Sequence, residues 1–207
     1  LKKIIPYLFV FLFLQTYSQT TFHTIGTDVI HNSNSSYPAP YGNWFWGAKN
    51  QFLVRASELQ AEGMSAGDIY SLSFDVFTAV STSLDNFEVS MKLTTDTDLS
   101  AGIQTGLTSV YGPQSYTDVN GWNMHDFITP FYWDGTSNII IETCFNNNSW
   151  SNPGNAIFNM STYSYESSCY RRSDNNTVCS STWTNGDEFE RPNMKFEWQD
   201  PNSPPGA

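Results

Sequence analysis

One segment matches the nucleophile pattern G-x-S-x-G of α/β-hydrolases, namely Gly63-Met64-Ser65-Ala66-Gly67. The hydrolase chemistry needs a strand, a sharp turn and then a helix, so that the serine is raised above a parallel sheet. In this sequence the predicted helix comes before the turn, and a predicted strand follows from Asp68. The order is reversed, so the two glycines are better explained as the end of a helix and the start of a strand.

Other catalytic sets are incomplete. His23, His31 and His125 form neither an H-E-x-x-H motif nor a close pair, which leaves a zinc hydrolase without its ligands. Asp126 and Glu142 lie near predicted central strands, but nothing singles them out as the paired carboxylates of a glycoside hydrolase. We therefore expect this region to have no enzymatic activity.

Two acidic segments, residues 96–100 and 174–176, offer the oxygen ligands that calcium prefers. Neither completes an EF-hand-like loop with its closing glutamate. A solvated acidic turn is the favoured interpretation, and structural calcium is the alternative. The sequence indicates no other cofactor and no metal site.

Aromatic residues give the strongest indication of function, since Phe, Trp and Tyr make up 16% of the chain. Exposed flat rings stack on sugars, whereas buried rings fill a core, which is the commoner use of aromatic residues. The candidate ligand-binding rings lie in loop-like or edge-like segments: Trp44, Trp46, Trp150, Tyr163 and Tyr165. Neighbouring amides would bond sugar hydroxyls: Asn43, Asn148 and Asn152.

The chain has three cysteines, Cys144, Cys169 and Cys179, with no C-x-x-C pair that would suggest zinc. In an oxidising compartment, one disulfide and one remaining thiol is the natural count. A bond between Cys144 and Cys179 would close a loop of about 35 residues, and a bond between Cys169 and Cys179 one of about 10 residues. The spacing alone leaves both pairings open.

The N-terminal segment predicts export. Lys2 and Lys3 precede an apolar segment from Ile4 to Leu14, and small residues then allow cleavage before Gln19. We expect residues 1–18 to be a signal peptide, with an uncleaved anchor as the alternative. The mature protein would then be secreted or held at the cell surface, without membrane insertion.

The charge of the mature chain restricts its partners. Without the two lysines of the signal peptide, seven basic residues stand against 20 acidic ones, which gives a net charge of −13. Binding to nucleic acid or to an anionic membrane needs basic patches, so neither partner is expected.

Alternation of apolar and polar residues predicts strands, most clearly over residues 70–76, 87–93 and 194–198. The apolar run 139–141 predicts a central strand covered on both faces. A capping box from Ser57 to Gln60, with Gly63 as the stop, predicts one short helix near residues 56–62. The predicted elements do not alternate between strand and helix, so a parallel sheet built of βαβ units is not expected. We therefore predict an all-β domain over residues 19–199: a two-sheet antiparallel β-sandwich, jelly-roll-like, with one short helix.

The last residues, 200–207, have the proline-rich composition of an extended linker. We expect this linker to lead to a downstream module.

Several stretches form a distinctive combination: residues 41–53, which begin Tyr41-Gly42-Asn43-Trp44, then 56–59, 63–69, 71–76, 121–123, 131–139 and 191–193. Together they resemble an N-terminal β-sandwich module of large multimodular secreted proteins of Bacteroidota-type bacteria, which look like cargo of type IX secretion. The resemblance covers nearly all of the mature chain. It implies an extracellular location and further modules of fibronectin or polycystic-kidney-disease type, but no reaction.

The resemblance also implies a disulfide pairing. In related modules the positions that match Cys144 and Cys179 carry cysteine, and the position that matches Cys169 is usually apolar. The expected bond is therefore Cys144–Cys179, with Cys169 free. The predicted function is that of a non-catalytic extracellular module that binds a polysaccharide or cell-surface glycan within a larger adhesin or exoenzyme. The alternative is a purely structural spacer.

Overall fold

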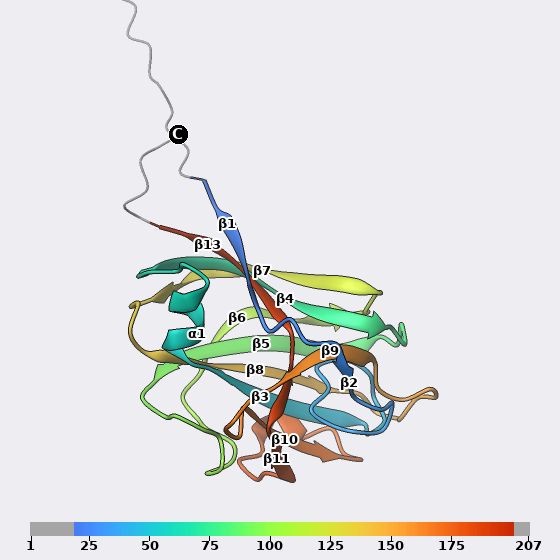
Figure 1. Ribbon diagram of the computed structural model, residues 1–207. Coiled ribbons are helices and arrows are strands. Elements are labelled where there is room, and N and C mark those ends of the chain that lie inside the picture. The colour runs from blue at the N-terminus through green and yellow to red at the C-terminus, as the bar shows by residue number, and fades with distance from the viewer. Residues whose placement is uncertain (1–18, 201–207) are drawn as a thin grey trace, which may run out of the picture.

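The structure is a computed structural model that describes residues 19–200. It consists of two antiparallel sheets that pack face to face as a sandwich, with one short helix at the side (Figure 1). The predicted signal peptide and residues 201–207 of the predicted linker lie outside the described residues.

The two sheets have seven and six strands. The seven-stranded sheet contains β1 (Thr21–Ile25), β2 (Ile30–His31), β4 (Gly67–Thr78), β7 (Gly121–Trp133), β9 (Ile157–Thr162), β12 (Glu190–Pro192) and β13 (Met194–Gln199). The six-stranded sheet contains β3 (Gly47–Val54), β5 (Leu84–Thr94), β6 (Thr108–Tyr116), β8 (Asn138–Asn146), β10 (Ser168–Ser173) and β11 (Gly186–Glu188). The remaining elements are helix α1 (Ala56–Ala61) and a 3-10 turn, η1 (Val178–Ser180).

The strand order is that of a jelly roll, as predicted. In one sheet β1 lies beside β13, β13 beside β4, and β4 beside β7; in the other the order is β3, β8, β5 and β6. From β3 to β9 the chain passes from one sheet to the other at every connection except that between β5 and β6, which is how a jelly roll wraps. Strands β9 to β12 are inserted between β8 and β13.

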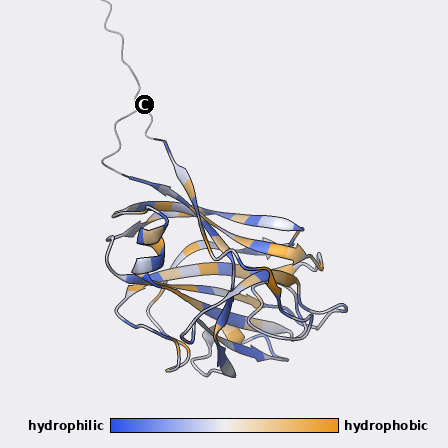
Figure 2. Cartoon of the chain, viewed as in Figure 1, coloured by the Kyte–Doolittle hydropathy of each residue, from blue (hydrophilic) through white to orange (hydrophobic). Residues whose placement is uncertain are grey.

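The main core lies between the facing sheets because apolar and polar residues alternate along the strands (Figure 2). Strand β8 is the predicted exception. Ile139 and Ile141 face the main core, whereas Ile140 faces a second apolar cluster on the other side of the sheet. Leu99, Ile103 and other residues cover that second side, so the apolar run is buried on both faces as predicted.

Two local predictions need correction. The short helix is present, but its N-cap is Arg55, whose backbone N–H donates to Glu58 Oε1 at 3.0 Å, so Ser57 and Gln60 do not form the capping box. In β4 the pairing shifts register between Ile69 and Ser71, and this bulge buries Ile69 where simple alternation would bury Tyr70.

The disulfide is Cys144–Cys179, and Cys169 is a buried free thiol, as the resemblance implied. Cys144 is in β8 and Cys179 in η1, with a sequence separation of 35 and Cα atoms 5.7 Å apart. Burial raises the pKa of Cys169 to about 12, so this thiol is a weak nucleophile at neutral pH.

Removing the disulfide in a Cys144→Ala/Cys179→Ala variant should lower the free energy of unfolding by about 2 to 4 kcal/mol, since the closed loop restricts the unfolded chain. Urea unfolding with and without a reductant measures this effect. The parent and a Cys169→Ala control should both lose stability in the reductant, and the double variant should not. A parent whose unfolding midpoint is unchanged, although mass spectrometry shows its thiols reduced, would contradict the prediction.

Candidate functional site

Loops from distant parts of the chain meet at one end of the six-stranded sheet. Strands β3 and β5 begin there, and β6, β8 and β10 end there, as the pairing of Gly47 with both Asn146 and Ser173 shows. Because α1 follows the last residue of β3, this loop end lies away from the helix (Figure 1). The loop end collects the segments 41–46, 79–83, 147–156 and 174–177.

Two of the predicted rings form an exposed pair at the loop end. Trp44 is 40% exposed and Trp150 is 57% exposed, and their ring centroids lie 6.3 Å apart in an edge-to-face arrangement. With Phe45 and Asp174 they line a shallow hollow of about 300 Å³, which we call the aromatic hollow. Large rings left in water next to each other form a surface that a flat apolar ligand face would cover.

Buried amides fix the backbone beneath these rings. The Asn43 side chain donates to the Ser149 carbonyl at 2.8 Å and accepts from the Ser151 hydroxyl. The Asn155 side chain accepts from the Trp44 backbone N–H at 3.1 Å. Asn43 is thus buried within the loops and is not free to bond a ligand, contrary to the prediction. Of the amides predicted with it, Asn148 and Asn152 are exposed.

Trp46 is half-buried and does not line the aromatic hollow. Its backbone N–H donates to Asp174 at 3.4 Å. The guanidinium of Arg172 lies 4.6 Å from the centroid of the Phe45 ring. Trp46 therefore belongs to the support of the site, and Trp44 and Trp150 form its surface.

Tyr163 and Tyr165 lie at the opposite end of β3, next to Leu53, and are separate from the tryptophan pair. Tyr165 is buried, Tyr163 is half-buried, and their ring centroids lie 5.6 Å apart. The guanidinium of Arg55 lies 3.5 Å from the Tyr165 ring centroid, and that of Arg191 lies 3.9 Å from the Tyr163 ring centroid. Both rings pack against cations of the protein, which leaves Trp44 and Trp150 as the exposed pair among the predicted rings.

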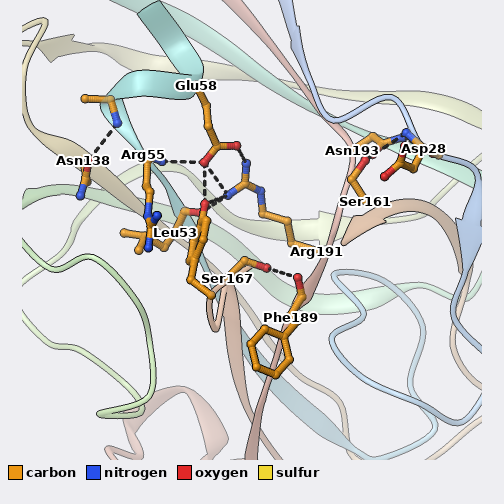
Figure 3. A network of polar contacts seen from close by, with 12 residues as sticks. Asp28, Leu53, Arg55, Glu58, Asn138, Ser161, Ser167, Phe189, Arg191 and Asn193 are labelled. Atoms are coloured by element: carbon orange, nitrogen blue, oxygen red, sulfur yellow. Dashed lines mark hydrogen bonds and ion pairs between the residues drawn. The ribbon is translucent and has the colours of Figure 1, made fainter. Parts of the chain in front are cut away.

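The same region contains the Arg191 cluster, a buried polar network drawn in Figure 3. Arg191 is fully buried, forms an ion pair with Glu58, and donates to the Leu53 carbonyl and to the Tyr165 hydroxyl. The Tyr165 hydroxyl also donates to Glu58 at 2.5 Å. The cluster joins β12 of the inserted segment to α1 and β3, so its role is to hold these elements together.

The residues considered for catalysis are dispersed or buried. Asp126 is in β7 and Glu142 in β8, which belong to different sheets. Glu142 forms an ion pair with Lys49 at 3.6 Å, and burial raises its pKa. His125 lies fully buried in the core. Ser65 lies between α1 and β4, which is the order opposite to that of a hydrolase serine.

The acidic segments bond mainly to their own turns. Asp96 accepts from the Thr94 hydroxyl at 2.7 Å, and Asp98 accepts from the Ser100 hydroxyl at 2.5 Å. In residues 19–200, no three His, Cys, Asp or Glu side chains are grouped to hold a metal ion. No helix among the described residues has the length and apolar character needed to cross a membrane.

Comparison with models of protein families, with curated proteins and with solved structures finds no match for the chain. The resemblance to a secreted β-sandwich module therefore stays a prediction. The function has to be inferred from the arrangement of the residues at the loop end.

Proposed function

We propose that the protein is a non-catalytic extracellular module that binds a polysaccharide or a cell-surface glycan through Trp44 and Trp150. The observation that carries this proposal is the exposed tryptophan pair, in which two distant loops hold large rings side by side. The pyranose ring of a sugar presents C–H groups on its faces, and stacking these faces on indole removes apolar surface from water.

The fixed backbone under the pair supports a binding role. A ligand that meets a preformed surface orders few side chains on binding, so less of the interaction energy is lost to entropy. Asn43 and Asn155 hold the loops that carry the rings, and Asn155 bonds the backbone of Trp44 itself.

The charge and the export signal are consistent with a glycan as the partner. A net charge of −13 for the mature chain disfavours nucleic acid, whose bases would also stack on the rings. The predicted signal peptide and the disulfide suit an extracellular module. On the resemblance alone, we place the module within a larger secreted adhesin or exoenzyme, next to other modules of the same chain.

A structural spacer is the second candidate. The observation that favours it is that Tyr163 and Tyr165, two of the predicted sugar-binding rings, serve the packing of the protein. The spacer proposal requires Trp44 and Trp150 to have no ligand.

Changing Trp150 to alanine should weaken glycan binding about fivefold, since an aromatic contact contributes about 1 kcal/mol beyond the area that it buries. Trp44→Ala should act in the same direction. A glycan array identifies a bound sugar, and calorimetry then measures the affinity of each variant. The matched control is Trp183→Ala, because Trp183 is 77% exposed but lies outside the aromatic hollow.

Both variants at the loop end should unfold near the temperature of the parent, because both rings lie at the surface. Equal affinity of the parent and Trp150→Ala for every bound sugar would reject the stacking role. No binding of the parent to any glycan would favour the spacer.

A further inference from the structure

A second hollow opens at the loop end, with a volume of about 510 Å³. Its lining is polar: Asp85, Asn86, Gln114, Ser115, Asn148 and Asn176, together with Asn146. These residues come from the start of β5, the end of β6 and the loops after β8 and β10. We call it the amide hollow. A mostly polar lining, rich in carboxamides, is unsuited to a hydrophobic ligand and suited to one that carries many hydroxyl groups.

The amides in this region divide into two groups. The Asn147 side chain accepts from the Asp85 backbone N–H at 2.8 Å and donates to the Ser83 carbonyl at 2.9 Å, and Asn146 accepts from the Val178 backbone N–H at 3.1 Å. These inner amides fix the loops. The structure shows no hydrogen bond within residues 19–200 for the outer side chains: Asp85, Asn86, Gln114, Ser115, Asn148 and Asn176.

The amide hollow and the aromatic hollow are neighbours. Asn148 lines the first and Trp150 the second, and only one residue separates them in the chain. Likewise, Asn176 lines the amide hollow and Asp174 lines the aromatic hollow, with one residue between them. Two short segments thus provide walls of both hollows, so the two hollows lie close to each other at the loop end.

The charged side chains that line the two hollows are both acidic, while the Arg172 guanidinium packs against Phe45, a wall of the aromatic hollow. Asp85 lines the amide hollow and Asp174 lines the aromatic hollow, and no lysine or arginine lines either of them. In the amide hollow, where no cation faces Asp85, its carboxylate repels a negatively charged ligand and attracts a positively charged one.

We propose that the aromatic and amide hollows are two subsites for one oligosaccharide, and that this oligosaccharide is built of neutral or amino sugars and not of uronic acids or sulfated sugars. One sugar stacks on Trp44 and Trp150. Further units lie in the amide hollow, where each carboxamide donates to one hydroxyl and accepts from another. This inference rests on the proposed glycan-binding function and adds to it the class of sugar and the length of the bound segment.

The test uses the full chain and calorimetry with defined probes. These are hexasaccharides of glucose, mannose, xylose and N-acetylglucosamine, the partly deacetylated form of the last, and a hexamer of galacturonic acid. We expect at least one neutral or amino-sugar hexamer to bind more than tenfold tighter than the hexauronate. An Asn86→Ala/Asn148→Ala variant should bind that hexamer about thirtyfold more weakly, because at least two hydrogen bonds of about 1 kcal/mol each are lost.

The control for the double variant is Gln60→Ala, which removes an exposed amide from α1 at the other end of the sandwich. Asp85→Asn should narrow the difference between the neutral hexamer and the hexauronate, because it removes a charge from the amide hollow. Its side chain has the same size and no hydrogen bond to lose within the described residues.

The outcomes separate this inference from the function on which it rests. If Trp150→Ala loses affinity while Asn86→Ala/Asn148→Ala binds like the parent, the second subsite is rejected and the glycan-binding function stands. If the hexauronate binds as tightly as every neutral hexamer, the selection by charge is rejected. If the parent binds none of the probes, the class of sugar inferred here is rejected, and the glycan array decides on the glycan-binding function.

Discussion

Replacing Glu58 with glutamine is expected to lower the free energy of unfolding by about 3 to 5 kcal/mol, because it leaves the Arg191 guanidinium buried without its counter-ion. Arg191 has no exposed surface, and the side chain of Glu58 is 19% exposed. The other groups around the guanidinium, the Leu53 carbonyl and the Tyr165 hydroxyl, are neutral. They solvate the cation in part but supply no opposite charge.

A second change tests whether the loss comes from the uncompensated charge. Adding Arg191→Met to Glu58→Gln should recover part of the lost stability, since replacing both partners of a buried ion pair costs less than removing one of them. Glu62→Gln is the control, because Glu62 is exposed at the end of the same helix and should have little effect. Urea unfolding monitored by tryptophan fluorescence measures all of these variants. A Glu58→Gln protein as stable as Glu62→Gln would show that the charge of Glu58 does not stabilise the fold.

The Arg191 cluster illustrates what a single sequence does not reveal. Glu58 and Arg191 are separated by 133 positions, and neither is part of a local pattern that would suggest burial. The surroundings of the tyrosines beside them could not be predicted for the same reason. Tyr163 and Tyr165 stand two positions apart in a polar segment, which is typical of an exposed edge, and only the folded structure places Arg55 and Arg191 against their rings.

The sheets, in contrast, could be predicted because their signals are local. Alternation along β4 and β13 fixes which face of each strand is apolar, and the run Ile139-Ile140-Ile141 indicates a strand covered on both sides. A β-bulge cannot be predicted from alternation. At Tyr70 the bulge adds one residue to the strand, so the side chains before it point to the opposite face from the one that alternation predicts.

The candidate site could be predicted from the sequence only in part. Trp44 and Trp150 could be selected by residue type, but their contact could not, because it depends on the antiparallel pairing of β3 with β8. Phe45 and most side chains of the amide hollow were missed, and Asp174 and Asn176 were considered only as calcium ligands. Isolated asparagines in an Asn- and Ser-rich chain carry no signal until the fold brings them together.

The second large effect concerns pH and a histidine in the core. His125 is fully buried, and its Nε2 is hydrogen-bonded to the Tyr41 hydroxyl at 2.5 Å. Its Nδ1 has no hydrogen-bond partner among the described residues. The rings of Tyr111 and Tyr116 each lie 4.6 Å from the imidazole, measured between centroids, and Phe87 lies 5.1 Å away. Water cannot solvate an imidazolium here, and burial lowers the pKa of His125 from 6.5 to about 3.

This shift makes the folded state sensitive to acid. A histidine whose pKa is lowered on folding contributes stability that is fully present above pH 6.5 and is lost as the pH falls toward about 3, because the unfolded chain then binds a proton that the folded protein rejects. The expected loss is about 1.4 kcal/mol for each pH unit in this range, or about 2 kcal/mol near pH 5.

Three carboxyl groups act in the opposite direction. Burial raises the pKa values of Asp118, Glu142 and Glu188, so their protonation favours the folded state as the pH falls. The part that belongs to His125 is therefore measured as a difference between variants and not from the parent alone. Tyr41 and Tyr116 also face the imidazole, but burial raises the pKa of both, so they stay neutral throughout the acid range.

A His125→Gln variant isolates the effect, because glutamine keeps a partner for the Tyr41 hydroxyl but does not titrate. At pH 7 the variant should be less stable than the parent, since a ring in a packed aromatic cluster is lost. From about pH 6.5 to about pH 4 the difference should shrink by about 3 kcal/mol, as the parent loses the contribution of His125 and the variant does not. His31→Gln, a change at the surface, should follow the parent. Urea unfolding at several pH values gives the difference, and a constant gap between the parent and His125→Gln across this range would show that the imidazole is protonated as readily in the core as in the unfolded chain.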